Sequence, residues 1–139
     1  MFACLVVLPA WSAEGGLMSY RQALLDKINQ RTAYVAVIGA GYVGLPVAVE
    51  FAQVGFKVIA LDVDARKVDL LNQGQSYIDD IPSETLKALV DSGHLSATTS
   101  YDDLRTVDAV SICVPTPLRK TKDPDMSYVI ESIAALGEV

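Results

Sequence analysis

The sequence predicts an α/β fold, in which helices cover both faces of a parallel β-sheet. Apolar runs at 33–38, 57–62 and 108–114 alternate with stretches whose apolar residues recur at helical spacing, as a doubly wound sheet requires. The first run leads into the glycine-rich turn 39–44, and the second delivers Asp62. A Rossmann-like unit is predicted by this order of features: a strand, a turn, a helix, a second strand and an acidic residue.

The turn has the pattern GxGxxG, and each of its glycines has a separate task. Gly39 lets the chain leave the strand sharply, Gly41 lets a pyrophosphate approach the backbone, and Gly44 lets the helix pack close to the strand. The remaining positions of the turn are Ala40, Tyr42 and Val43. Free N–H groups and the dipole at the start of the helix favour the negative charge of a phosphate. The turn therefore predicts a dinucleotide site; the alternative is that these glycines serve only a tight connection.

Asp62 lies 21 residues beyond Gly41, where a spacing of about 20 is typical of dinucleotide-binding units. Its carboxylate could accept hydrogen bonds from both hydroxyls of an adenosine ribose, and it would repel a 2′-phosphate. This favours NAD over NADP. Arg66 and Lys67 lie nearby in the sequence and oppose that preference.

The other elements follow from apolar spacing and from turn residues. We expect helices over 20–29, 42–54, 65–73 and 83–92, a short strand at 95–99, a helical turn at 102–104, and a last helix from Asp125 or Ser127. Three details are specific enough to check. Val43, Val47, Phe51 and Val54 should face the sheet, Ser83 should cap its helix, and Met126, Val129, Ile130, Ile133 and Leu136 should share one face.

About four strands can be counted, whereas a complete doubly wound fold has about six. We therefore expect an incomplete NAD-binding domain over 33–139, preceded by a helical cap over 18–32. Residues 1–17 are interpreted as a leader that is upstream of the natural start or not native, with a cleaved export signal as the alternative. An incomplete sheet would expose an apolar edge, favouring self-association or weak cofactor binding.

Composition excludes several classes of function. The chain has 139 residues, 51% of them hydrophobic, and a net charge of −6, which fits one packed domain and argues against a nucleic-acid partner. The apolar segment near the start is too short to span a bilayer. Two cysteines and one histidine predict neither a disulfide framework nor a metal site.

Three motifs, in order, carry a resemblance to one family. The run 37–46 resembles the opening of the UDP-glucose/GDP-mannose dehydrogenases, because Gly44-Leu45-Pro46 goes beyond the generic glycine pattern. The segments 113–118 and 123–129 are similar to two later motifs of that family. Within the family, 74–82 looks most like the branch that oxidises UDP-N-acetylglucosamine at C6.

The resemblance implies a reaction in which the C6 alcohol of a UDP-sugar becomes a carboxylate through two NAD-dependent hydride transfers. It implies that 39–44 hold the pyrophosphate, that Asp62 holds the ribose and that Arg66 flanks the adenosine. The residues implied for the nicotinamide half are Val114, Thr116 and Pro117. The full-length enzyme is expected to be a cytoplasmic homodimer in polysaccharide biosynthesis.

The resemblance also implies that catalytic groups lie elsewhere. The family's catalytic cysteine and sugar-binding lysine belong to a later part of the chain, and Cys113 stands in a different motif. We expect no catalytic residue here, and NAD binding without turnover. Two alternatives stay open: another NAD-dependent dehydrogenase, of the hydroxyacid or phosphogluconate type, and an NAD-binding module without enzymatic activity.

Overall fold

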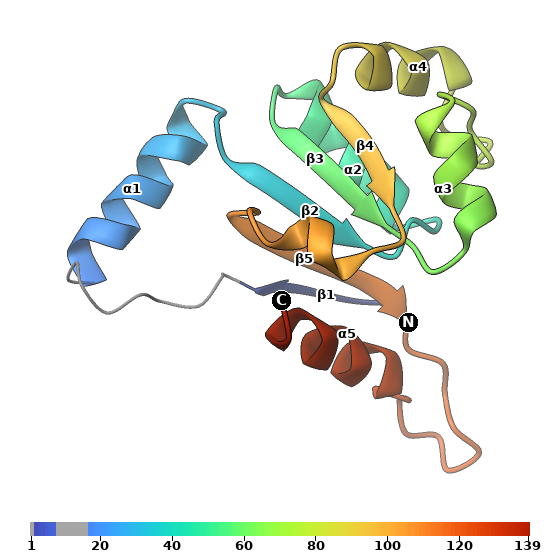
Figure 1. Cartoon of the computed structure of the whole chain (residues 1–139). Helices are drawn as coiled ribbons and strands as arrows, with labels where there is room; N and C mark the ends of the chain where they lie inside the picture. The colour runs from blue at the N-terminus through green and yellow to red at the C-terminus, as the bar shows by residue number, and fades with distance from the viewer. Residues whose placement is uncertain (1, 8–16) are drawn as a thin grey trace.

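The computed structural model describes residues 2–7 and 17–139, and a five-stranded sheet lies at its centre (Figure 1). The strands are β1 (Phe2–Val7), β2 (Tyr34–Ile38), β3 (Lys57–Leu61), β4 (Leu95–Thr98) and β5 (Ala109–Pro115). Their order across the sheet is β1-β5-β2-β3-β4. Strands β2 to β5 are parallel, whereas β1 pairs antiparallel with β5. The predicted parallel α/β sheet of four strands is confirmed, and β1 was not predicted.

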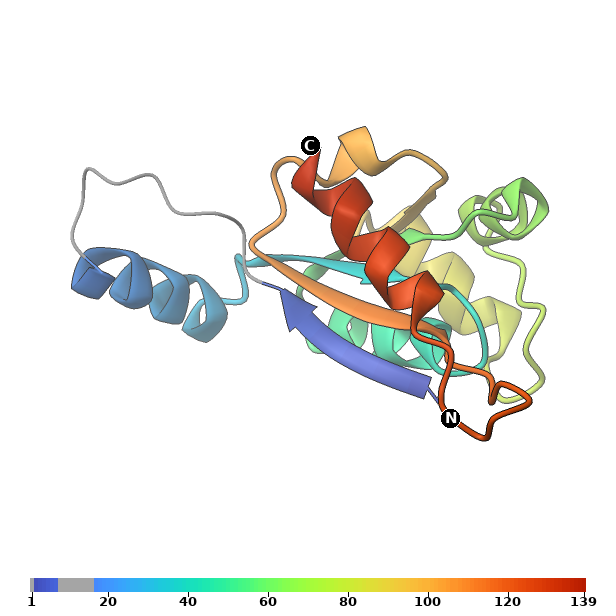
Figure 2. The same ribbon diagram turned by 90° about the horizontal axis from the view of Figure 1, so that it is seen from below.

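The helices lie on both faces of this sheet, except for the first, which lies apart from the strands in Figure 1. They are α1 (Leu17–Asn29), α2 (Gly44–Gln53), α3 (Ala65–Asn72), α4 (Ser83–Asp91), the 3₁₀ turn η1 (Tyr101–Leu104) and α5 (Ser127–Gly137). α2 and α4 share one apolar core with the sheet, and η1 and α5 share the other. Figure 2 shows α5 lying over the sheet near β5, as the contact between them requires.

Alternation along the strands produces the two cores. Val35 and Val37 of β2 belong to the core under α2, while Ala36 and Ile38 point into the core under α5. Successive side chains of a strand point to opposite faces, so a strand that is covered on both faces is apolar at nearly every position. This explains why the sequence shows continuous apolar runs instead of alternating ones.

Three details of the helices differ from the predictions. Leu45, Ala48, Val49 and Ala52 form the buried side of α2. Val43, Val47 and Phe51 pack only at its margin, and Val54 is 50% exposed. The small alanines and Gly44 let α2 approach the sheet closely, and Val43 and Val47 lie beside this contact and not within it.

The prediction that Ser83 caps α4 is wrong, because the N-cap is Pro82 and Ser83 is the first helical residue. The Ser83 hydroxyl instead accepts a hydrogen bond from the backbone N–H of Ser76, at 2.9 Å. In α5, Val129 and Ser132 are buried, whereas Ile130 and Ile133 are exposed. The predicted single apolar face of α5 is therefore only partly directed at the core.

Strand β1 covers the outer edge of β5, with Phe2 opposite Pro115 and Val7 opposite Val110. This edge was expected to be open, because the sequence places no further parallel strand there. The interpretation of 1–17 as a leader is not tested by this pairing, and residues 1 and 8–16 of that segment lie outside the described residues. In the described part of the chain, none of the helices combines the length and the apolarity needed to cross a membrane.

The turn between β2 and α2 is packed so closely that two of its glycines cannot carry a side chain. Gly39 has φ +93°, and an added Cβ would lie 2.5 Å from the carbonyl oxygen of Cys113 in β5. A Cβ on Gly44 would lie 1.7 Å from the carbonyl oxygen of Gly39. These contacts hold the ends of β2 and β5 and the start of α2 against one another.

Replacement of Gly44 by alanine should prevent this packing, because the new methyl group would overlap rigid backbone atoms. We expect the free energy of unfolding to fall by about 3 kcal/mol or more, at the upper end for overpacked sites. Urea denaturation followed by circular dichroism measures the change.

The matched control is Gly41→Ala, since nothing lies within 4 Å of a Cβ at that position. Its free energy of unfolding should stay within about 0.5 kcal/mol of the unsubstituted chain. Equal stability of the two variants would contradict the packing described above.

Candidate functional site

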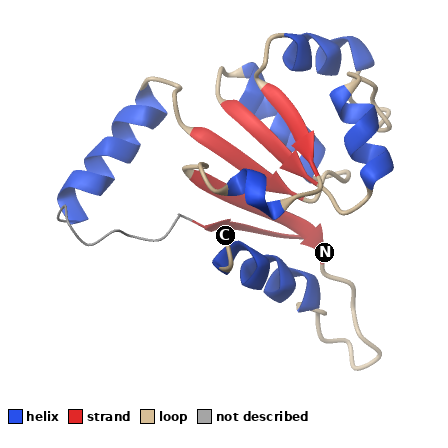
Figure 3. Ribbon diagram, in the orientation of Figure 1, coloured by secondary structure: helices blue, strands red, loops and turns tan. Residues whose placement is uncertain are grey.

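The carboxyl ends of β2, β3 and β5 meet at one edge of the sheet. At this point the chain switches from adding strands on one side of β2 to adding them on the other side. β2 lies between β3 and β5, and the chain moves from β2 to one side first and to the other side later. The arrowheads of β2, β3 and β5 point to the same edge in Figure 3. Ligands of open α/β sheets bind in the crevice at such a switch point. The glycine turn, Asp62 and Thr116 each follow one of these strands, so the structure brings them to this edge.

The glycine turn presents its backbone to solvent at one position. A Cβ on Gly41 would meet no atom within 4 Å, in contrast to Gly39 and Gly44. Tyr42 beside it is 76% exposed. The N-cap of α2 is Val43, whose apolar side chain makes no capping hydrogen bond. The turn therefore leaves open space over Gly41. The helix that follows has free N–H groups at its start and no acidic side chain in its first turn.

Asp62 is 7% exposed and ties the glycine turn to the end of β3. Its Oδ2 accepts the backbone N–H of Ala40 at 3.0 Å and lies 3.2 Å from Lys67 Nζ. Its Oδ1 accepts the backbone N–H of Asp64 at 2.9 Å. A carboxylate offers about four acceptor positions, so these three bonds leave capacity on Oδ1 for a hydroxyl group.

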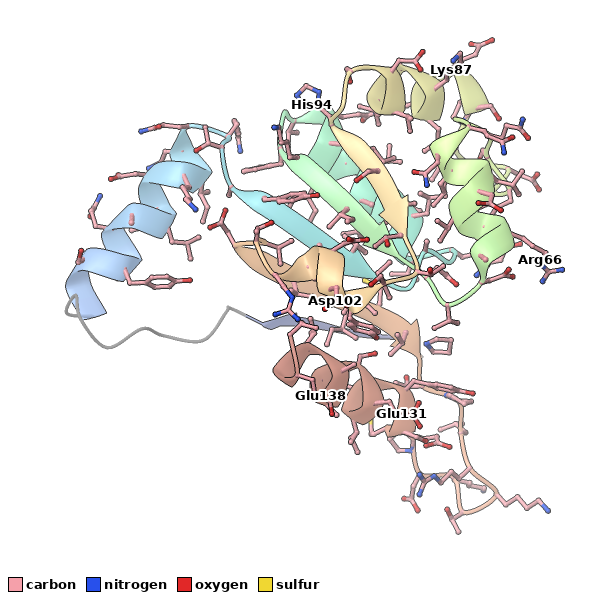
Figure 4. The ribbon with its side chains drawn as sticks, in the orientation of Figure 1. Arg66, Lys87, His94, Asp102, Glu131 and Glu138 are labelled. Carbon is pink, nitrogen blue, oxygen red and sulfur yellow. The ribbon has the colours of Figure 1, made fainter. Side chains whose placement is uncertain are left out.

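Of the two neighbouring cations Arg66 and Lys67, it is Lys67 that contacts Asp62. The Arg66 guanidinium makes two bonds to Asp64, at 3.1 and 2.9 Å, and points away from the sheet in Figure 4. This side-chain bond lowers the pKa of Asp64 and raises the pKa of Arg66. Lys67, which the sequence analysis named only as a neighbour, is the cation on Asp62. That Arg66 flanks an adenosine stays a prediction.

A cavity of about 330 Å³ opens between the sheet ends and α5. Gly39, Asp62 and Val114 line it from the strand ends, and Tyr128 and Glu131 line it from the α5 side. Tyr101 of η1 also lines it. Sequence reasoning missed Tyr101, Tyr128 and Glu131, since they are far from the motif in the chain and only the fold brings them near.

Of the three residues implied for the nicotinamide half of NAD, only one lines this cavity. Val114 lines it, whereas Thr116 and Pro117 are not among its lining residues. Thr116 is buried at 2% exposure. The Pro117 carbonyl accepts the backbone N–H of Asp125 at 2.7 Å, which closes the following loop at its base.

Asp125 organises the return of this loop to α5. Arg119 donates to Asp125 Oδ1 at 2.8 Å, and the Ser127 backbone N–H donates to the same oxygen at 3.1 Å. These bonds, the Arg119 bond above all, hold the pKa of Asp125 well below its usual range. The helix that carries Tyr128 and Glu131 therefore begins at a fixed point beside the strand ends.

A second cavity, of about 340 Å³, lies on the other face of the sheet. Its lining is apolar apart from Ser111 and includes Leu24 and Ile28 of α1, Phe51 of α2, and Phe56. It offers no charged group for a phosphate. The chemistry of a dinucleotide therefore fits the first cavity and the turn beside it.

The buried thiol of Cys113 does not line the cavity beside Asp62. Cys113 is buried beside Gly44, at 3% exposure. Among residues 2–7 and 17–139, no group of three or more His, Cys, Asp and Glu side chains could hold a metal ion.

Comparison with known proteins matches this geometry to one family. Residues 33–139 match the NAD-binding domain of the UDP-glucose/GDP-mannose dehydrogenase family. UDP-N-acetyl-D-mannosamine dehydrogenase of Salmonella typhimurium is 38% identical over 106 residues, which are 76% of this chain and 24% of that protein. NDP-N-acetyl-D-galactosaminuronic acid dehydrogenase of Ralstonia nicotianae is also 38% identical, with the same coverage.

Solved structures give the same result. A UDP-glucose dehydrogenase from Pyrobaculum islandicum superposes with a TM-score of 0.71 at 35% identity, covering 76% of this chain and 25% of that structure. The chain thus spans about a quarter of the length of the relatives that it matches. The glycine turn, Asp62 and the matched segment agree on one cofactor, NAD, and the chain belongs to the UDP-glucose/GDP-mannose dehydrogenase family, with residues 33–139 forming its NAD-binding domain.

Proposed function

We propose that this chain is the cofactor-binding part of an NAD-dependent dehydrogenase that oxidises C6 of a UDP-sugar to the uronate. The observation that carries the proposal is the open space over the backbone of Gly41, between two glycines that have no room for a side chain. A glycine needed only for a tight turn would be crowded or strained. Gly41 is neither, so the space above it is left for a ligand.

The site residues suggest how NAD is held. The pyrophosphate would lie over Gly41 at the start of α2, where N–H groups and the helix dipole favour its charge. The adenosine ribose would donate its hydroxyls to Asp62, and Lys67 would fix that carboxylate. Tyr101 offers aromatic surface for the adenine in the adjoining cavity. The nicotinamide would extend toward Val114, Thr116 and Pro117, and Arg66 would stay at the adenosine side.

We propose UDP-N-acetylglucosamine as the sugar, because 74–82 resembles the branch that uses it. The curated relatives above act on other N-acetylated sugars, which supports an N-acetylated substrate more generally. The complete enzyme would supply the thiol that traps the aldehyde and would act as a cytoplasmic homodimer. This chain alone would bind NAD without oxidising a sugar, and Cys113, being buried, would not replace the missing thiol.

Gly41→Ala should abolish tight NAD binding while leaving the fold intact. The methyl group enters the space proposed for the pyrophosphate, so we expect the dissociation constant to rise at least about tenfold, roughly 1.4 kcal/mol. Calorimetric titration of the purified chain with NAD measures this. Unchanged affinity in Gly41→Ala would place the pyrophosphate elsewhere.

NADP should bind at least about tenfold more weakly than NAD, because its 2′-phosphate would face the Asp62 carboxylate. Asp62→Asn keeps an oxygen acceptor but removes the charge, so it should reduce this discrimination. Lys67→Met should increase it, because the cation that offsets Asp62 is lost. The same calorimetric titrations test all three chains. Equal affinity for both cofactors in the unsubstituted chain would contradict the assignment of Asp62 to the ribose.

A longer chain that contains this segment and the later catalytic part should reduce two NAD per UDP-N-acetylglucosamine oxidised. Absorbance of the NADH formed measures the stoichiometry, with UDP-N-acetylmannosamine and UDP-glucose as comparison substrates. Faster turnover of either comparison substrate would contradict the proposed sugar. Absence of NADH with all three would favour the alternative of a binding module.

A further inference from the structure

The loop 74–82, between α3 and α4, reaches the glycine turn through one side chain. The Tyr77 hydroxyl donates a hydrogen bond to the carbonyl oxygen of Ala40, at 2.5 Å. Ala40 is the residue of the turn between Gly39 and Gly41, and it is fully buried. The contact therefore joins a segment 37 residues away to the middle of the phosphate-binding turn.

Four residues form a closed set of contacts around this point. Ala40 receives Tyr77 on its carbonyl and donates its N–H to Asp62 Oδ2 at 3.0 Å. Lys67 Nζ lies 3.2 Å from the same oxygen of Asp62. It also lies 5.9 Å from the centroid of the Tyr77 ring, within the range of a cation–π contact. Tyr77 thus contacts both Ala40 and Lys67, the two residues that bind Oδ2 of Asp62.

The loop presents Tyr77 from an anchored position. Ile78 and Ile81 on either side of the acidic pair Asp79-Asp80 are buried in the core. The Ser76 hydroxyl donates to the Ile78 carbonyl at 2.9 Å, and the Ser76 N–H donates to Ser83. Burial, followed by the charges of Asp62 and Asp64, raises the pKa of Tyr77 far above its ordinary value. The hydroxyl therefore stays protonated and remains a donor at ordinary pH.

We propose that Tyr77 is a positioning residue for the cofactor, holding the Ala40 carbonyl with its hydroxyl and Lys67 with its ring. The proposal adds a residue to the NAD site and rests on the binding mode proposed above. The 74–82 loop then sets the affinity of the domain for NAD, although it lies outside the glycine motif and outside the cavity lined by Asp62. Tyr77 acts through the turn and does not touch the reacting atoms.

Tyr77→Phe tests the hydroxyl without removing the ring. We expect the dissociation constant for NAD to rise about fivefold, the effect of one neutral hydrogen bond. Affinity for adenosine, which has no pyrophosphate, should change less than twofold, because Asp62 and Lys67 keep their contacts. The melting temperature without ligand should fall by only a few degrees, because one buried hydrogen bond is lost. Calorimetry with NAD, ADP and adenosine gives the comparison.

The matched control is Tyr34→Phe, the same chemical change at the opposite end of β2. It should leave all three affinities unchanged. Lys67→Met provides the contrast, because it should weaken adenosine binding as well as NAD binding.

Unchanged NAD affinity in Tyr77→Phe would overturn the proposal. An equal loss for NAD and adenosine would also overturn it, because the hydroxyl would then only support the fold. Failure of the unsubstituted chain to bind NAD is a different result, since it would contradict the proposed function itself before any variant is compared.

Discussion

The close contact between the glycine turn and its neighbours determines how the rest of the domain is arranged. The backbone of Gly39 lies against the carbonyl of Cys113 in β5, and the backbone of Gly44 lies against Gly39. These approaches are possible only without side chains. They fix the start of α2 over the end of β2, and they bring the helix terminus to the edge where β3 and β5 also end. The binding site is the consequence of this packing.

Asp62 has a structural task, and the proposed cofactor site gives it a binding task as well. A buried carboxylate is stable only when it is well hydrogen-bonded, and here the turn, the start of α3 and Lys67 supply its partners. The site is therefore formed before a ligand arrives. It also follows that removal of the whole side chain would disturb the turn, which makes Asp62→Asn the informative substitution for cofactor choice.

Local sequence patterns predicted the structural features that are determined by residues close together in the sequence. The glycine turn, Asp62 and the four parallel strands all have short-range signals, and their positions are confirmed. Contacts between distant segments had no such signal. Tyr77 on Ala40 and Tyr101 in the cavity depend on how loops return to the sheet edge. Whether Lys67 or Arg66 contacts Asp62 depends on the direction in which α3 leaves its cap at Asp64.

The remaining errors have the same origin. Val54 and Ile130 fit a helical apolar pattern, but the close approach of α2 and the angle of α5 decide which members of the pattern are buried. Strand β1 was not predicted, because its partner β5 lies more than 100 residues later in the chain. The roles of Arg66, Thr116 and Pro117 toward NAD stay predictions, because none of the three lines the cavity beside Asp62.

The most direct test of this account is an NMR titration of the isotope-labelled chain with NAD, followed through backbone amide shifts. The account predicts saturable changes that are largest at Ala40 to Gly44 and at Asp62 to Asp64, with smaller ones at Tyr101 and Tyr128. Residues of the apolar cavity under α1, such as Leu24 and Phe51, should not respond. Changes centred on that cavity, or no change at the glycine turn, would contradict the claim that the packed turn forms the cofactor site.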